Sequence, residues 1–217
     1  MKQKLTIKLL CREAGYFAQA ESSHAEPAIF GVTDGKAVGT YLEHKFQASL
    51  REKYKYAEGS SAKGIDFPEI GVDIKVTSIK QPQSSCPFKN ARQKIFGLGY
   101  SLLVFVYDKT DNPQTRTGTL SILHTIFIEA GRTADYQTTT GILDIVRNKG
   151  NEDDIVAFMQ DHLLPVEEIQ ALQIAGEILA NPPNVGYLTI SNALQWRLQY
   201  RRVIDEAGKV DGIHRIR

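Results

Sequence analysis

The chain has 217 residues, of which 42% are hydrophobic and 24% are charged, and its formal net charge at pH 7 is +1. This length and apolar content suffice for one domain with an appendage, and the near-neutral charge excludes a global attraction to nucleic acid, so any DNA-binding surface must be local. Two cysteines, Cys11 and Cys86, are too few for a disulfide framework and favour a reducing cytoplasm. We expect neither a signal peptide nor a membrane span.

The first elements expected are two amphipathic helices. Residues 2–20 predict an opening helix, and a polar link over residues 21–27 follows it. Residues 38–50 predict the second helix, because apolar side chains recur at the spacing i, i+4 and i+8, at Leu42, Phe46 and Leu50. Glu43 flanks this apolar stripe. It is therefore either a residue at the boundary of the core or a carboxylate aimed into a polar site that the helix covers.

The most informative stretch of the chain is the segment 64–77. Alternation of apolar and polar residues predicts a strand with Asp73 and Lys75 on one face and, on the other, Val72, Ile74 and Val76. Asp66 lies seven residues before Asp73 across a turn-forming segment, so a hairpin can bring the two carboxylates together. Two hard oxygen ligands on rigid backbone suit Mg²⁺. The alternative is a pair of solvated charges on an exposed strand face.

The next elements expected are a helix and two strands. Residues 90–100 predict a helix that leads into the apolar strand 101–107, and residues 120–128 predict a second strand. A loop over residues 108–118 separates the two strands. We therefore expect an α/β (α+β) catalytic core, with a mixed central sheet flanked by helices, over residues 1–134.

From residue 135 onwards the pattern changes, and a helical C-terminal region is expected over residues 135–217. Asn151 begins one helix with acidic residues at the positive end of the helix dipole, and Pro165 begins the next. Asn181, followed by two prolines, ends that second helix.

The segment 189–202 is expected to be a helix that follows a tight turn, as the second helix of a helix-turn-helix would. Ile190, Leu194 and Leu198 would face a core. The outward side chains are of the types that read base edges or contact phosphate: Asn192, Gln195, Gln199 and Arg202. The alternative is an ordinary amphipathic terminal helix that packs on the domain.

The ordered set of a helix-borne Glu43, then Asp66, then Asp73-Ile74-Lys75 resembles the active-site pattern of the PD-(D/E)xK nuclease superfamily, which includes most restriction endonucleases. The block from Asp66 to Lys75 is most similar to that of the MutH mismatch-repair nuclease and its restriction-enzyme relatives. In that group the acid before the lysine is usually Glu, whereas here it is Asp73. The resemblance covers roughly residues 36–130, and it implies a restriction-endonuclease-like core.

The resemblance also implies roles for individual residues. The catalytic residues would be Glu43, Asp66, Asp73 and Lys75, and the metal ligands would be Asp66, Asp73 and the carbonyl of Ile74. Lys75 would orient or deprotonate the attacking water and contact the scissile phosphate. Beyond this set, the loop after the catalytic strand offers DNA contacts at Lys80, Gln81 and Gln83. Lys94 is either a second phosphate contact or a solvated helix lysine.

Together these features predict a Mg²⁺-dependent, sequence-specific endonuclease that cuts double-stranded DNA, namely a type II restriction enzyme. One alternative is a MutH-like repair nuclease that nicks one strand. A second is a non-catalytic helix-turn-helix DNA-binding protein, in which the charges of segment 64–77 would serve no catalysis. Because cleavage of both strands needs two sites acting together or one site used twice, a homodimer is expected. No organic cofactor and no membrane contact are expected.

Overall fold

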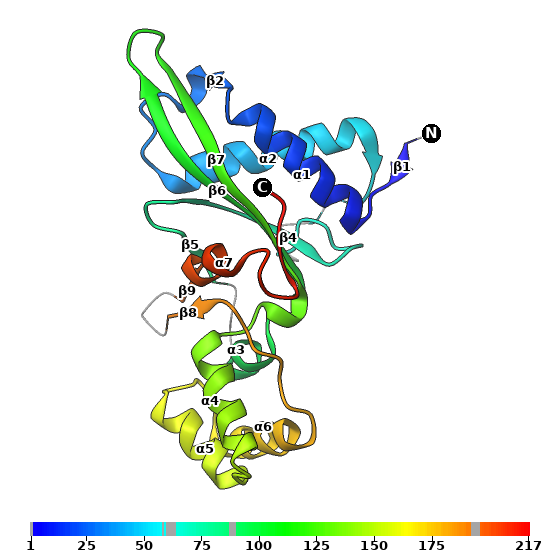
Figure 1. Cartoon of the computed structure of the whole chain (residues 1–217), viewed down its shortest axis with the longest axis vertical. Helices are drawn as coiled ribbons and strands as arrows, with labels where there is room; N and C mark the ends of the chain where they lie inside the picture. The colour runs from blue at the N-terminus through cyan, green and yellow to red at the C-terminus, as the bar shows by residue number, and fades with distance from the viewer. Residues whose placement is uncertain (1, 58, 60–63, 87–89, 192–195) are drawn as a thin grey trace. The chain divides into compact units, whose positions relative to one another are not determined.

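The computed structural model describes residues 2–57, 59, 64–86, 90–191 and 196–217 (Figure 1). The chain forms two compact units, each built from separate stretches of sequence. The first unit contains Met1–Ser84, Leu102–Ile128 and Glu206–Arg217, and the second contains Ser85–Ser101 and Glu129–Asp205. Each unit contains residues from both sides of position 134, where the sequence analysis placed a domain boundary. A catalytic core confined to residues 1–134 stays a prediction.

The first unit is built on a central sheet with the strand order β10-β7-β6-β4. β6 (Ser101–Asn112) and β7 (Thr117–Ile128) form a long antiparallel hairpin, with a register shift between Val106 and Tyr107. β4 (Val72–Ser78) lies beside β6 at one edge, and β10 (Ile213–Arg215) pairs antiparallel with β7 at the other. The short β2 (Ala25–Glu26) also pairs with β7. The predicted sheet is confirmed, but the expected loop 108–118 is mostly hairpin strand.

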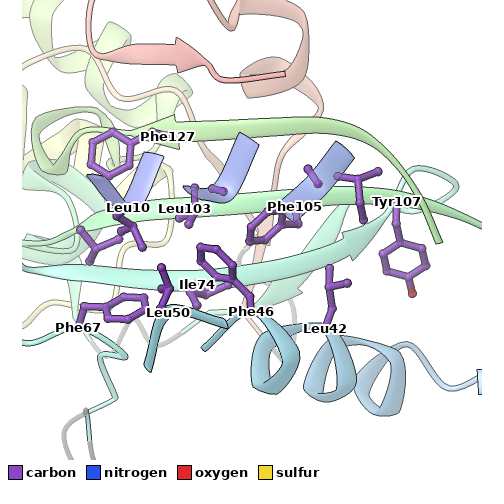
Figure 2. Packing of buried hydrophobic residues seen from close by; sticks show 14 of the residues in the cluster. Leu10, Leu42, Phe46, Leu50, Phe67, Ile74, Leu103, Phe105, Tyr107 and Phe127 are labelled. Carbon is purple, nitrogen blue, oxygen red and sulfur yellow. The ribbon is translucent and has the colours of Figure 1, made fainter. Parts of the chain in front are cut away.

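Two helices of the first unit cover this sheet. α1 (Ile7–Glu21) packs on β7, and α2 (Gly35–Lys53) packs on β4. The side chains of Thr6 and Asp34 cap the two helix starts by accepting backbone N–H bonds. The predicted stripe of α2 is buried against the sheet, and Figure 2 shows its side chains lying against those of β4 and β6. This packing fixes one face of α2 in the core and leaves the neighbouring face for polar residues.

A buried carboxylate ties the end of α2 to α1. Glu13 is only 6% exposed and accepts a 2.8 Å hydrogen bond from the hydroxyl of Tyr54. The Lys53 ammonium donates to the same carboxylate at 2.7 Å, and Arg12 donates at 3.1 Å. Tyr54 begins β3 (Tyr54–Lys55), which pairs parallel with β1 (Gln3–Lys4). Because a buried charge is stable only when it is paired and hydrogen-bonded, this network holds the end of α2 in place.

The second unit is mainly helical. After α3 (Ala91–Phe96) it continues through η2 (Ala130–Arg132), α4 (Tyr136–Arg147), α5 (Glu152–Asp161) and α6 (Glu168–Ala180). Asn151 and Asp154 form a reciprocal capping box at the start of α5, as the acidic start of that helix indicated. α6 ends one residue before Asn181, as predicted. α3 is shorter than the expected helix 90–100, because Gly97 has a φ of 92° and ends it.

The predicted helix 189–202 is wrong in the described residues. Thr189–Ile190 (β8) and Arg197–Gln199 (β9) are antiparallel strands, and the next helix, α7 (Arg201–Glu206), begins only after them. The physical reason is a long-range contact, because the backbone N–H of Ile190 donates to the buried carboxylate of Asp135 at 2.8 Å. This bond fixes an extended backbone that the helical spacing of apolar residues did not indicate. The helix-turn-helix prediction therefore fails at its recognition helix.

The remaining described elements are short, namely η1 (Pro27–Ile29) and β5 (Gln83–Ser85). Both cysteines are free thiols. Among the described residues, no helix is long and apolar enough to span a membrane.

Candidate active site

The four predicted catalytic residues line one cavity of about 340 Å³ in the first unit. Glu43 comes from α2, Asp66 from the turn before β4, and Asp73 and Lys75 from β4 itself. The other described lining residues are His44, Gln47, Gly59, Gly64, Ile65 and Ile74. The structure thus brings together side chains that the sequence analysis grouped by pattern alone.

The turn between Asp66 and Asp73 is closed by backbone bonds. Phe67 and Val72 exchange two hydrogen bonds, at 2.9 and 3.2 Å, and Gly71 adopts a φ of 61° that L-residues with side chains rarely take. Phe67 is buried and packs edge-on against the ring of Tyr56, with centroids 5.3 Å apart. This packing anchors the backbone next to Asp66. The predicted return of the Asp66 carboxylate towards β4 is therefore observed.

The Asp66 carboxylate is held at both oxygens by neutral donors. The backbone N–H of Ile74 donates to Oδ2 at 2.8 Å, and the side-chain amide of Gln47 donates to Oδ1 at 3.0 Å. Gln47 lies one helical turn after Glu43 on α2. Each carboxylate oxygen has a second lone pair, so both remain able to bind a cation.

Asp73 and Lys75 form a close ion pair on the site face of β4. The Lys75 Nζ lies 2.7 Å from Asp73 Oδ2, and the two side chains are 23% and 6% exposed. Asp73 Oδ2 is buried within ion-pair distance of the Lys75 ammonium, and no further donor among the described residues reaches this oxygen. This oxygen therefore has acceptor capacity to spare. On the opposite face of β4, Val72 and Ile74 are buried in the core, as the alternation predicted.

Burial and mutual repulsion disfavour the charged forms of two site carboxyls. The pKa of Glu43 is raised to about 7, first by burial and then by the charges of Asp66 and Asp73, while Lys75 opposes the shift. The pKa of Asp73 is raised to about 6, again chiefly by burial, with Asp66 adding to the shift and Lys75 opposing it. Among the described residues, Lys75 thus faces three clustered carboxyls. A positive charge placed here would relieve the repulsion.

The donor set fits Mg²⁺ better than a metal that needs a complete protein cage. Among the described residues, no group of three or more Asp, Glu, His or Cys side chains is arranged to hold a metal ion. Two carboxylates, on Asp66 and Asp73, together with the Ile74 backbone still suit Mg²⁺, because this ion usually keeps several waters and takes one or two carboxylates plus substrate phosphate. The carboxyls of Glu43, Asp66 and Asp73 meet at this cavity, and this excess of negative charge favours a cation over a purely structural ion pair.

The predicted loop contacts follow directly after β4. Lys80 and Gln81 are exposed and Gln83 is half-buried, so their side chains are accessible. The buried hydroxyl of Thr77 accepts from the backbone N–H of Gln83 at 2.9 Å and lies 3.0 Å from its carbonyl, which fixes the loop backbone. Lys80 Nζ is 4.0 Å from Asp108. Their contact with DNA stays a prediction.

Three more predicted DNA-binding residues are described by the structure, and none of them lines the cavity: Lys94, Gln199 and Arg202. Lys94 is only 5% exposed, its pKa is lowered by burial, and its Nζ lies 5.9 Å from the centroid of the Trp196 ring, so the expectation of a solvated lysine is wrong. Arg202 stacks over Tyr136, with its guanidinium carbon 3.6 Å from the ring centroid, and does not project from a helix face as predicted. Gln199 lies on β9. Asn192 and Gln195 lie outside the described residues.

Sequence reasoning missed two residues that line the cavity. Gln47 was given no role, although its place four residues after Glu43 puts both on one side of α2. His44 also has no role in the sequence analysis, and it is an exposed residue that lines the cavity. The helical spacing from Glu43 was the signal that could have found Gln47.

The comparisons with known proteins decide the family. The family model described as "Type II restriction enzyme NspV" matches residues 4–215. The chain belongs to the NspV family of type II restriction enzymes. The type II restriction enzyme NspV of Nostoc sp. (strain ATCC 29411 / PCC 7524) is 66% identical over 209 residues, which cover 96% of this chain and 95% of that protein. No solved structure matches the chain. Membership of the NspV family confirms the predicted class, a type II site-specific deoxyribonuclease.

Proposed function

We propose that the cavity between α2 and β4 is the active site of a Mg²⁺-dependent endonuclease that hydrolyses phosphodiester bonds of double-stranded DNA. The observation that carries the proposal is the convergence of Glu43, Asp66, Asp73 and Lys75 on one cavity, where the buried Asp73 carboxylate pairs with Lys75 at 2.7 Å. The proposal is supported by the family, whose members are restriction enzymes.

Asp66 and Asp73 would hold the cation, with the Ile74 carbonyl as a further oxygen ligand. When bound, Mg²⁺ supplies Lewis-acid stabilisation of the charge that develops on the phosphate oxygens. Glu43 would add a third carboxyl to the cluster, either directly or through water. The hydrogen bonds that Asp66 accepts from Ile74 and Gln47 keep its carboxylate in one orientation before substrate arrives.

Lys75 would act on the water and on the scissile phosphate. Its ammonium lies at the border of the cavity, partly exposed, so it can reach a phosphate that enters from solvent. A point positive charge beside the phosphate stabilises the transition state, and the same ammonium can orient the attacking water. To act as the base instead, Lys75 would first have to release its own proton to solvent and react as the neutral amine. Because Asp73 already holds this ammonium at 2.7 Å, Lys75 needs no large movement to serve the reaction.

A plasmid digest in the presence and absence of Mg²⁺ tests this function. Discrete linear bands that appear only with Mg²⁺ are expected for a restriction enzyme. A relaxed circle without linear product would instead indicate a MutH-like nicking enzyme. An unchanged plasmid that is nevertheless retarded in a gel would indicate a non-catalytic DNA-binding protein, and this result would defeat the proposal.

Cutting both strands requires two active sites or two successive reactions, so we propose that a homodimer is the form that cuts. Sedimentation with a duplex that contains the recognised site tests this. Two protein chains on each duplex are expected, and one chain on each duplex at complete cleavage would contradict the homodimer.

A further inference from the structure

The orientation of Asp66 depends on a side chain that has no charge. Gln47 Nε2 donates to Asp66 Oδ1 at 3.0 Å, while the backbone N–H of Ile74 donates to Oδ2 at 2.8 Å. One donor comes from α2 and the other from β4, so the carboxylate is fixed between two elements of the same unit. If the Gln47 donor were lost, one of the two hydrogen bonds that Asp66 accepts from described residues of α2 and β4 would be missing, and the carboxylate could rotate about the Ile74 bond.

Gln47 is itself held in place. Its backbone carbonyl accepts a 3.1 Å hydrogen bond from the hydroxyl of Tyr56, and the Tyr56 ring packs on Phe67. Phe67 follows Asp66 directly in the chain. The donor and the acceptor of the Gln47–Asp66 bond are therefore tied to the same pair of aromatic side chains, which limits their relative movement.

The chemistry of the amide suits this position. A lysine or arginine here would also donate to Asp66, but its charge would compete with a cation for the same carboxylate. A glutamate could not donate to Asp66 and would add a further carboxyl to a cluster that already contains Glu43, Asp66 and Asp73. An amide donates a hydrogen bond and leaves the negative charge of the site available.

We propose that Gln47 is a positioning residue that orients Asp66 for divalent-cation binding. This inference rests on the function proposed above. Gln47 acts through Asp66 and is not itself a metal ligand or a catalytic residue. Residues that orient metal ligands typically change metal affinity by about 10–100-fold when they are replaced.

The test measures cation binding in the absence of DNA. Mn²⁺ is the probe, and the electron paramagnetic resonance signal of the unbound ion is the readout. Gln47→Met keeps the length of the side chain and removes the donor, and it should weaken Mn²⁺ binding by about 10–100-fold. In cleavage assays the same variant should need more Mg²⁺ for half-maximal rate, and most of the rate should return at saturating Mg²⁺. Gln19→Ala, at an exposed position of α1, is the matched control and should bind Mn²⁺ as the wild type does.

Three results would overturn the inference. Unchanged Mn²⁺ affinity in Gln47→Met is the first. A loss of Mn²⁺ binding that accompanies a large loss of melting temperature relative to Gln19→Ala and is not recovered at saturating Mn²⁺ is the second, because it would show a purely structural role. The third is a Gln47→Glu variant that binds Mn²⁺ at least as tightly as the wild type, because this would make the position a ligand.

Different results would contradict the proposed function and the role of Gln47. A wild-type protein that neither binds Mn²⁺ nor cuts DNA with Mg²⁺ would defeat the proposed function. A wild-type protein that does both, beside a Gln47→Met variant that behaves identically, would defeat only the role of Gln47.

Discussion

Lys75 and Asp73 lie two residues apart on β4, and their charged atoms are 2.7 Å apart at the border of a cavity that also contains Glu43 and Asp66. Alternation along the strand places both on one face. The pair is asymmetric, because Asp73 is almost completely buried whereas Lys75 keeps 23% of its side chain exposed. The carboxylate is thus placed to hold a cation within the protein, while the ammonium can meet a phosphate that arrives from solvent.

The first prediction concerns this pair. Asp73→Ala and Lys75→Ala should each lower the cleavage rate by at least about 100-fold and leave specific DNA binding largely intact, because their interactions serve the transition state more than the bound substrate. Cleavage and gel retardation are measured side by side on the same duplex. A Lys75→Ala enzyme that cuts within a few-fold of the wild type would remove the lysine from the mechanism.

The second prediction concerns the stability of the metal-free protein. The pKa of Glu43 is about 7 in the folded protein and 4.5 in its ordinary state, so the folded protein binds this proton more tightly than the unfolded chain does. The free energy of unfolding therefore falls as the pH rises from about 4.5 to about 7. Glu43→Gln removes this pH-dependent loss of stability and should raise the free energy of unfolding at pH 8 by up to about 3 kcal/mol.

Denaturant unfolding of both proteins at several pH values measures this effect. The gain from Glu43→Gln should shrink towards zero as the pH falls below about 4.5, since Glu43 then becomes protonated in the unfolded chain as well as in the folded protein. Cleavage by the variant should be strongly reduced at every pH. A variant that is less stable than the wild type at pH 8 would show that Glu43 is a structural residue of the core boundary.

The third prediction links Mg²⁺ to pH through Asp73. Mg²⁺ should raise the melting temperature of the wild type, because it binds the folded site and relieves the repulsion among the carboxylates. The increase should be largest at pH 8 and should diminish as the pH falls through about 6, where Asp73 takes up a proton that competes with the cation. Thermal scans with and without Mg²⁺ at pH 5 and pH 8 measure it. An equal increase at both values would contradict binding at Asp73.

The fourth prediction concerns base recognition by the loop after β4. Gln81→Ala or Gln83→Ala should cost about 1–3 kcal/mol of discrimination between the recognised sequence and a sequence changed at one base pair, if either side chain makes a bidentate base contact. Lys80→Ala should weaken binding to all sequences alike and reduce its salt dependence, as expected for a phosphate contact. Equilibrium binding to both duplexes at several salt concentrations separates the two effects. Unaltered discrimination in both glutamine variants would place base recognition elsewhere.

The fifth prediction concerns Arg202, which stacks on Tyr136. Arg202→Ala should lower the free energy of unfolding by about 1–2 kcal/mol, because a cation over an aromatic ring contributes this much when it is partly desolvated. Arg201→Ala is the control, because Arg201 is the preceding residue and its side chain is exposed. Equal stability of the two variants would show that the stacking contributes nothing measurable.

Local sequence patterns predicted the parts of the fold that depend on local contacts. The spacing of Leu42, Phe46 and Leu50 predicted α2, and the alternation around Asp73 predicted which face of β4 carries the site. In both cases the residues that give the pattern are also those that form the core. The turn residues before β4 indicated that Asp66 returns to the strand.

Long-range contacts explain what the sequence did not predict. Ile190 and Leu198 fit a helical spacing, but a hydrogen bond from Ile190 to Asp135, distant in the chain, selects the extended conformation instead. Lys94 is buried by residues that lie far from it in sequence. The spacing of Gln47 from Glu43 indicates which side of α2 it lies on, but its role depends on Asp66, a partner on another element that no pattern within α2 identifies.

The pairing of β10 with β7 has a consequence for how the protein folds. β10 belongs to residues Glu206–Arg217, whereas β7 belongs to a stretch that ends at Ile128, and the second unit occupies the chain between them. Contacts between residues so far apart in sequence form late and slowly, because loop closure precedes any gain from the pairing. The sheet that supports the candidate active site is therefore complete only after the C-terminal strand has docked, so newly made chains should acquire nuclease activity as one of the last events of folding.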